Sequence, residues 1–501
     1  MQTNILTGSS NTPFGSNAAI TLNNGALGLG TAGTLGSGNV MNVTGYNVTY
    51  NGQNSINLTA GSGNVTFAAN SLTRTNNGVL VLNPTSGATL GTTEKVTVAS
   101  GAPAVINGMV APYYVDGTTR NFLTYDATNG FKDVTYSVTG SGPSAISTAL
   151  STDTVFLNGA TLNTTMGGNK AIYALKLSNS STFNANAIGV SGETLTLLSG
   201  GLILDMVGQG SGFNFSSGTV YATVNFGTAE AMIGVYGTGG TASLGNSAPF
   251  IGTGGLTLYG NGNASGSSIL ITGGVTIAGA KFTVGSTNGI NTNNQLTIDK
   301  AGTLQFAGQS QQFLGLSGQG LINASSGSGT LTLDGLTGTG TTTFSGLIQN
   351  GAGTVALTKN GANTQVLTGA NTYAGTTTVN NGTLRLDFSG ADAPAANILN
   401  NLTNGSALAL GGGKLEIVGA AGVTNSQQFN GLTVGAGNSS ITASSGSGGS
   451  ANVTLGATLT RSVGGTINFD LPTSGTVSTT ATTFAGNGVL VSGSATGPAF
   501  A

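Results

Sequence analysis

The stretch that decides the fold runs Leu357-Thr-Lys-Asn-Gly-Ala-Asn-Thr-Gln-Val-Leu-Thr-Gly-Ala-Asn-Thr-Tyr-Ala-Gly-Thr-Thr-Thr-Val-Asn-Asn-Gly-Thr-Leu-Arg-Leu386. It closes on Gly382-Thr-Leu384-Arg-Leu386, in which the apolar residues occupy alternate positions. A period of two is the signature of a strand with one buried face. The preceding Asn-Asn-Gly predicts a sharp corner, because Asn and Gly both tolerate a positive φ. The stretch therefore predicts strands joined by tight corners.

The same unit, a Gly-containing turn followed by alternating apolar residues, recurs along the chain. Its clearest copies are Gly25–Leu29, Gly63–Phe67, Gly78–Leu82, Gly302–Phe306, Gly329–Leu333, Gly413–Ile417 and Gly465–Phe469. Helical periodicity is nowhere sustained, and only Ser144–Leu150 and Ala393–Leu402 could hold a short helical turn. Many short strands with turns about every ten residues leave a sandwich, a barrel or a solenoid.

Length decides among these architectures. A chain of 501 residues is too long for one sandwich core, whereas a solenoid can grow indefinitely because each coil packs only on its neighbours. We therefore expect an all-β chain folded as a parallel, right-handed β-helix (β-solenoid). At about 20–25 residues per coil it would form roughly twenty coils.

Composition excludes most chemistry. The chain has 87 Gly, no Cys, no His and only 26 charged residues (12 Lys+Arg and 14 Asp+Glu), so charged residues make up 5% against roughly 25% in ordinary proteins. Disulfides, thiol nucleophiles, imidazole ligands and His-based triads are absent by composition. We expect no catalytic residues, no cofactor and no metal site. A net charge of −2 argues against a nucleic-acid partner, and no apolar run reaches the ~18 residues of a transmembrane segment.

A longer repeat links the two ends of the sequence. Ser71–Gly87 parallels Thr458–Gly475, with Leu-Thr-Arg and Pro-Thr-Ser-Gly in the same order in both. The match includes Arg74 and Arg461, and Arg is rare in this chain. Such copies are expected of a window from a long tandem array.

The quoted stretch resembles the autotransporter-associated β-strand repeat, through Leu367-Thr-Gly-Ala-Asn-Thr-Tyr373 and through Asn381-Gly-Thr-Leu-Arg-Leu386. The strict match covers about 30 residues, and looser echoes such as Gln295–Gly308 and Gly329–Gly346 extend it. The resemblance implies a β-helical passenger placed outside the cell or on the bacterial cell surface.

These observations predict three regions. Residues 1–111 are expected to form solenoid coils, and residues 112–177 an aromatic and charged excursion that returns to the solenoid. Residues 178–501 are expected to continue the solenoid, with the autotransporter-type repeat at 357–387 and an end segment that resembles the N-terminal coils.

The segment Pro112–Tyr136 concentrates charges and aromatic rings as no other stretch does. One interpretation is a binding patch for glycans or a lyase-like site, with rings stacking on sugars. The other, which we favour, is a hairpin or loop near 112–136 that leaves the solenoid and packs its aromatic side chains back on it. The candidate patch consists of Tyr113, Tyr114, Asp116, Arg120, Phe122, Tyr125 and Asp126.

Three functions remain open from the sequence. The leading hypothesis is a non-catalytic structural protein of the cell surface, a rigid solenoid that stacks end to end with itself as a homo-oligomer or filament. The alternative is an adhesin that binds glycans or surfaces. The second alternative is an enzyme of the polysaccharide-lyase type, because β-helices also carry that activity.

Overall fold

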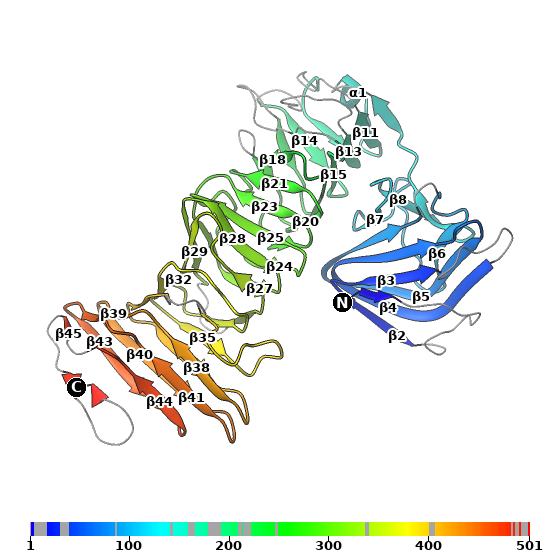
Figure 1. Cartoon of the computed structure of the whole chain (residues 1–501). Helices are drawn as coiled ribbons and strands as arrows, with labels where there is room; N and C mark the ends of the chain where they lie inside the picture. The colour runs from blue at the N-terminus through cyan, green and yellow to red at the C-terminus, as the bar shows by residue number, and fades with distance from the viewer. Residues whose placement is uncertain are drawn as a thin grey trace. The chain divides into compact units, whose positions relative to one another are not determined.

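A computed structural model describes residues 2–4, 18–30, 40–85, 88–140, 144–158, 166–178, 192–208, 213, 222–245, 249–335, 340–399, 406–481, 484–485, 490–491 and 499–500. The chain divides into two compact units, Met1–Lys281 and Phe282–Ala501. Both are built from strands that pair in parallel from one coil to the next (Figure 1). The helix of the described part is the short α1 (Ser144–Ser147), inside one of the two segments for which a helical turn was expected. An all-β parallel solenoid is thus confirmed, and its handedness stays a prediction.

The first unit opens with a stack of three-faced coils. Two long strands, β4 (Val40–Thr59) and β5 (Asn64–Asn83), each run along all three faces of one coil and pair in parallel. Shorter strands extend the stack: β1 (Gln2–Asn4), β2 (Ala19–Asn23), β3 (Ala26–Gly30), β6 (Glu94–Val98) and β7 (Tyr114–Asp116). β6 pairs with residues 65–69 of β5, β2 with residues 47–51 of β4, and β7 with residues 80–82 of β5. Each long strand thus has three segments, one for each face of the coil.

The corners of these coils lie where the register between β4 and β5 shifts. The shifts fall between Thr44 and Tyr46 and between Asn51 and Gln53, at Gly45 and Gly52, whose φ angles are 90° and 72°. A side chain would be strained at these φ values, so glycine makes the bend possible. At Gly52 an added Cβ would also meet the side chain of Asn24 at 2.2 Å.

An antiparallel hairpin follows, formed by β8 (Leu123–Asp126) and β9 (Gly130–Asp133). It lies within the expected excursion at 112–136 and confirms a hairpin there, whereas Tyr114–Asp116 of the same segment still pairs in parallel with β5. The chain then enters a second stack of parallel strands, which occupies the rest of the first unit.

One face of this second stack is the sheet β10 (Val138–Gly140), β11 (Thr154–Asn158), β13 (Ala174–Ser178), β15 (Gly201–Asp205), β17 (Ala231–Tyr236), β20 (Leu256–Gly260) and β22 (Val275–Ile277). A second face contains β12 (Lys170–Ile172), β14 (Thr194–Leu197), β16 (Thr223–Asn225) and β19 (Phe250–Ile251). A further face contains β18 (Thr241–Leu244) and β21 (Asn263–Gly266).

The second unit repeats the three-faced plan. Its first face is the sheet β24 (Gln295–Ile298), β27 (Gly315–Gly318), β30 (Thr341–Phe344), β33 (Thr364–Leu367), β35 (Thr383–Asp387), β37 (Lys414–Val418), β40 (Gly437–Ser444) and β43 (Gly465–Asp470). Thr364 pairs with Thr383 and Thr383 with Lys414, so one coil step spans 19 residues and the next spans 31. Loops at the corners absorb this variation, as expected of a solenoid.

The other faces of this unit are equally regular. One contains β23 (Lys281–Val284), β25 (Thr303–Ala307), β28 (Leu321–Ser326) and β31 (Leu347–Ile348). Further along the chain, a separate sheet contains β38 (Thr424–Gln428), β41 (Ser450–Thr454) and β44 (Gly475–Ser478). The third contains β26 (Gln311–Phe313), β29 (Ser328–Leu333), β32 (Thr354–Lys359), β34 (Thr377–Val379), β36 (Leu408–Leu410), β39 (Leu432–Val434), β42 (Leu459–Arg461) and β45 (Phe484–Ala485). The short strands β46 (Leu490–Val491) and β47 (Ala499–Phe500) pair antiparallel.

The core is a set of aligned columns. Leu384 pairs with Leu415, and Leu415 with Ile441, and all three side chains are buried. Their neighbours in sequence point outward, so β35 and β37 alternate between half-buried and buried positions. The alternation of the sequence is thus the inside–outside alternation of the coil, and stacking identical positions fills the interior.

The long repeat has a structural counterpart. The three segments of β5 that carry Asn-Val-Thr, Leu-Thr-Arg and the apolar run after Gly78 correspond to β41, β42 and β43. In both copies the arginine closes the corner in the same way: Arg74 Nε donates to the carbonyl of Gly78, and Arg461 Nε to that of Gly465, each at 2.7 Å. The repeated sequence therefore encodes one complete three-faced coil.

Buried glutamines complete the backbone pairing where adjacent strands do not meet. The β27–β30 register contains only the Gly318–Phe344 pair. Gln365 reaches across from β33: its Oε1 accepts from the Leu316 N–H at 3.0 Å and its Nε2 donates to the Leu316 carbonyl at 2.9 Å. Gln311 does the same for Ile290, and Gln427 for Leu399. Each side-chain amide thus stands in for a peptide group of a missing strand.

We predict that Gln365→Leu destabilises the second unit. The change leaves the Leu316 N–H and C=O buried without their partner, at a cost of about 1–3 kcal/mol for each unpaired group. Urea unfolding followed by circular dichroism measures the loss. Gln428→Leu is the matched control, because Gln428 is exposed at the end of β38. Equal stability of the two variants would contradict the role assigned to Gln365.

Candidate functional site

The outer face of the first unit's main sheet is covered. Where one face of a solenoid strand is exposed to solvent, buried and exposed side chains alternate along the strand. In β15, β17, β20 and β22, however, every residue is buried. The cover is the N-terminal stack with its hairpin. Both sides contribute to one hydrophobic cluster: Val79, Val81, Met109, Val115, Phe122 and Val134 from the N-terminal stack and hairpin region, with Ala174, Ile203, Met232, Tyr236, Tyr259 and Ala278 from the solenoid.

An ion pair anchors this cover. Arg74 of β5 binds Glu230 through two contacts, Nη1 to Oε2 at 2.7 Å and Nη2 to Oε1 at 3.0 Å. The guanidinium also lies 4.2 Å from the centre of the Tyr113 ring, and Thr257 donates its hydroxyl to Glu230. Both charged side chains are 19% exposed. A two-contact Arg–carboxylate pair with little water around it fixes orientation as well as position.

The structure does not bring the seven residues of the predicted patch together in one surface, and its aromatic rings pack on two different cores. Tyr114 is buried in the core of the N-terminal stack, where its ring lies 4.9 Å from that of Phe131. Phe122 belongs instead to the cluster under the cover and is fully buried. Tyr113 is half-buried between Arg74 and Tyr114. These rings therefore pack the hairpin region onto the coils and do not form one open platform.

Tyr125 and Asp126 lie on the hairpin itself. The Tyr125 hydroxyl accepts from the Val98 N–H at 2.9 Å and so ties β8 to β6. Asp126 accepts from the N–H groups of Thr128 and Asn129 and binds Lys132 at 2.7 Å. The hydrogen bond from Lys132 lowers the pKa of Asp126. Tyr125 and Asp126 are half-exposed, and their use in ligand binding stays a prediction.

Asp116 and Arg120 belong to a polar turn between the hairpin region and the solenoid. Asp116 is 1% exposed and accepts from the N–H groups of Thr118 and Thr119, each at 2.7 Å. Arg120 adopts a φ of 55° and places its Nε 2.9 Å from Asp205 Oδ1. Burial raises the pKa of Asp116 to about 6.

Lys176 links the same turn to β13. Its Nζ donates to the Thr119 carbonyl at 2.9 Å and to Asn121 Oδ1 at 2.7 Å, and it lies 3.8 Å from Asp205. Burial lowers the pKa of Lys176 to about 8. The cluster of Arg120, Lys176 and Asp205 is thus a second polar clamp that holds the cover in place.

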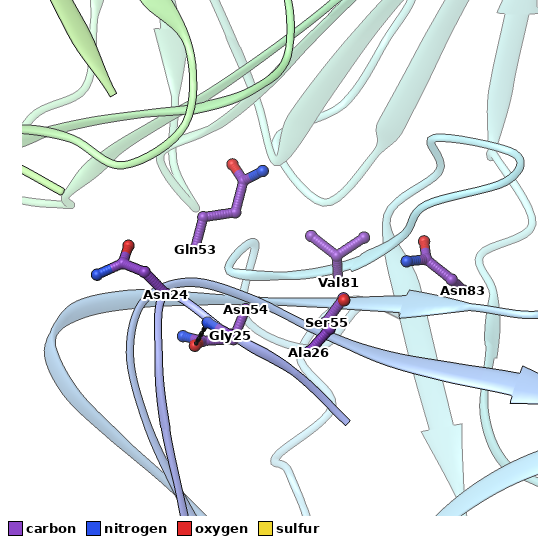
Figure 2. A pocket seen from close by; sticks show the side chains of 8 residues that line it. All are labelled: Asn24, Gly25, Ala26, Gln53, Asn54, Ser55, Val81 and Asn83. Atoms are coloured by element: carbon purple, nitrogen blue, oxygen red, sulfur yellow. Dashed lines mark hydrogen bonds between the residues drawn. The ribbon is translucent and has the colours of Figure 1, made fainter. Parts of the chain in front are cut away.

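An open pocket of about 380 Å³ lies on the N-terminal stack itself, on the face formed by β3 and the last thirds of β4 and β5. Figure 2 shows Asn24 and Gln53 on one side, Val81 and Asn83 on the other, and the remaining residues between them. Its lining consists of Asn24, Gly25, Ala26, Gln53, Asn54, Ser55, Val81 and Asn83. Amide and hydroxyl groups dominate it, and no charged residue belongs to it.

Sequence reasoning missed both the cover and the pocket. The cover has a signal: Leu202-Ile-Leu204 and Ala231–Tyr236 lack the polar alternation of the other strands, which is typical of strands buried on both faces. The pocket has none, because Asn, Ser and Gly are spread along the entire chain. Arg74 stood out only as a member of the long repeat.

The buried carboxylates have structural partners. Glu94 accepts from the N–H groups of Ala60 and Thr85, and Glu193 from those of Met166 and Gly168. Among the described residues no three His, Cys, Asp or Glu side chains gather as a metal site. Nor does this part of the chain contain a helix long and apolar enough to cross a membrane. Fold and site together define a parallel β-solenoid whose charged groups fasten its own backbone.

Comparison with known proteins agrees with this class. Residues 357–386 match the family model of the passenger-associated-transport-repeat, so the predicted autotransporter repeat is confirmed there. The chain is 30% identical over 312 residues to the adhesin BmaC autotransporter of Brucella suis biovar 1 (strain 1330). That alignment covers 60% of this chain and 9% of the relative, so the chain spans less than a tenth of that protein. No solved structure matches. Both likenesses support an extracellular, cell-surface location.

We predict that Arg74→Ala loosens the N-terminal cover. Removing the guanidinium leaves Glu230 without its charged partner in a largely buried place, at a cost on the order of 3 kcal/mol. Hydrogen exchange should then accelerate in residues 64–83 and 231–236, while unit 2 stays protected. Lys95→Ala is the control, because its bonds to the hairpin are long and partly exposed. Unchanged exchange in Arg74→Ala would contradict the anchoring role.

We also predict a pH dependence centred on Asp116. Its folded pKa of about 6 lies above the unfolded value of 3.8, so the folded state disfavours the carboxylate. Its contribution to stability is complete below the unfolded pKa and is lost as the pH rises through 6, by on the order of 3 kcal/mol. A carbon NMR titration of the carboxyl should show a midpoint near 6.

Asp116→Asn separates this effect from others. The amide still accepts from Thr118 and Thr119 but cannot ionise, so urea unfolding of this variant should depend less on pH between 4 and 7 than that of the wild type. Asp126→Asn is the opposite control, because a lowered pKa makes a contribution that is lost as the pH falls. An Asp116 midpoint near 4 would refute the prediction.

Proposed function

We propose that this chain is a non-catalytic structural module of a cell-surface passenger, a rigid β-solenoid that associates with itself. The observation that carries the proposal is the use of its scarce charges. Glu94 and Glu193 fasten corners, and Arg74–Glu230 and Arg120–Asp205 fasten the cover. Catalytic carboxylates need a convergent, tuned arrangement, and these are committed to backbone N–H groups and to permanent ion pairs.

Self-association follows from the repetition of one coil. The coil of residues 64–83 and the coil of residues 450–470 share their order of faces and their arginine corner. Parallel coils pair through backbone groups that are the same at each step, so a coil of a second copy has the complementary edge. We therefore propose a second copy of the chain as its partner.

The proposal predicts two results for the purified chain. Sedimentation velocity should reveal larger species as the concentration rises, and incubation with Ca²⁺ and uronic-acid polymers should give no rise in ultraviolet absorbance. The absorbance assay detects the unsaturated ends that a lyase would produce.

The two measurements test separate parts of the proposal, self-association and the absence of lyase activity. A single monomer at all concentrations would remove self-association and leave the structural role. A Ca²⁺-dependent rise in absorbance that grows with protein concentration would overturn the non-catalytic assignment. A commercial lyase in the same buffer controls for the assay.

Adhesion is the second candidate function. It is favoured by the similarity to the BmaC adhesin over 60% of this chain. In that case the solenoid would carry a binding site outward, and the site must lie on a surface that the cover leaves open.

A further inference from the structure

We propose that the pocket lined by Asn24, Gln53, Ser55 and Asn83 binds a neutral saccharide unit. The inference deepens the adhesive function above and rests on it. None of the seven residues of the patch that the sequence suggested lines the pocket, so the two sites differ. Its volume of about 380 Å³ falls in the range of small-ligand sites, roughly 300–1,000 Å³.

The lining selects the charge of the ligand. Four amide side chains and one hydroxyl line the pocket, and no Lys, Arg, Asp or Glu does. An anionic ligand would lose its hydration without gaining a cation, and a cationic ligand would gain no carboxylate. A neutral ligand with many hydroxyl groups meets no such penalty.

Several polar groups are already held in position. Gln53 Oε1 accepts from the Gly260 N–H at 2.6 Å, and Asn83 Nδ2 donates to Asn57 Oδ1 at 2.7 Å. Asn54 is 1% exposed; its Oδ1 accepts from the Gly25 N–H and its Nδ2 donates to the Asn51 and Gly52 carbonyls. The amides are therefore fixed before a ligand arrives, which reduces the entropy lost on binding.

The remaining groups lack partners within the described part of the chain. Gln53 Nε2 and the Ser55 hydroxyl make no hydrogen bond there, and both belong to residues of the lining. A ligand hydroxyl can accept from Gln53 Nε2 and can donate to or accept from the Ser55 hydroxyl. A saccharide fits because each of its hydroxyls both donates and accepts, matching amide groups that offer one donor and one acceptor side by side.

The apolar part of the lining fits the same ligand. Ala26 and Val81 contribute methyl groups to the pocket. A sugar ring carries C–H groups as well as hydroxyls, so it can cover these methyls while its hydroxyls meet the amides. A simple ion or a cluster of water molecules would leave the methyl groups of Ala26 and Val81 in contact with water.

The test is a binding measurement on the whole chain. Wild-type protein is screened on an array of neutral, sialylated and sulfated oligosaccharides, and the best neutral saccharide is then titrated by calorimetry. We expect binding to neutral members of the array and at least a ten-fold weaker affinity in Ser55→Val, which removes the hydroxyl and narrows the pocket. Thr21→Val is the matched control, because Thr21 is exposed on β2 outside the pocket.

Each outcome of this measurement either supports or overturns the assignment of the pocket as a saccharide site. No neutral saccharide bound, acidic saccharides alone bound, or equal affinity in Ser55→Val and wild type would each overturn the pocket assignment. Thermal unfolding of both variants checks that the coil is intact, and Gln53→Glu gives a second test that keeps the bond from Gly260 and adds a charge. Attachment of protein-coated beads to host cells is scored in parallel. Attachment that persists in Ser55→Val refutes this site but leaves adhesion standing, whereas no attachment by the wild type refutes adhesion itself.

Discussion

The hydrogen bonding of each coil's backbone to the coils before and after it is the constraint on which the rest of this molecule depends. Parallel pairing satisfies the N–H and C=O groups along the faces, but it cannot do so at the corners, where the chain bends and register shifts. The unusual composition answers that problem. Glycines such as Gly45 and Gly52 allow the bend, and asparagines with positive φ, such as Asn76 and Asn77, turn the chain without a loop. The buried carboxylates and glutamines then pair the groups that remain, as Glu94 does for Ala60 and Gln365 for Leu316.

The same constraint explains why so few charges suffice. A charged side chain on a coil face costs nothing when it points to water, but it contributes little there. In this chain several of the charges lie instead where the solenoid leaves its regular plan: at the docking of the N-terminal stack, at the turn that contains Asp116 and Arg120, and at irregular corners. Arg74 illustrates the economy, because one guanidinium closes its own corner through Gly78, stacks on Tyr113 and binds Glu230 on the other stack.

The strands, the corners and the parallel stacking of coils could be predicted from the sequence, and the docking of distant coils on one another could not. Alternation in Gly382–Leu386 predicts β35, and Asn-Asn-Gly predicts the corner at which Gly382 adopts a φ of 63°. Both depend on neighbouring residues only. The cover depends instead on contacts such as Arg74–Glu230, which join residues 156 positions apart, and a single sequence contains no sign of which distant segments meet. The aromatic patch shows the same limit: its rings were recognised, but which of them face a core depends on the fold of the whole unit.

The pocket is the hardest feature to see in the sequence, and the reason is physical. Its amides are chemically the same as those that line the outer faces of all the coils, where they are solvated and interchangeable. What distinguishes Asn24, Gln53, Ser55 and Asn83 is that they line one pocket and that docking of the N-terminal stack fixes Gln53 on Gly260. Without this docking, Gln53 would lose its bond to Gly260 and would resemble the other polar side chains of the outer faces. Docking of one stack of coils on another therefore fixes a polar side chain that a straight stack of coils would leave free in solvent.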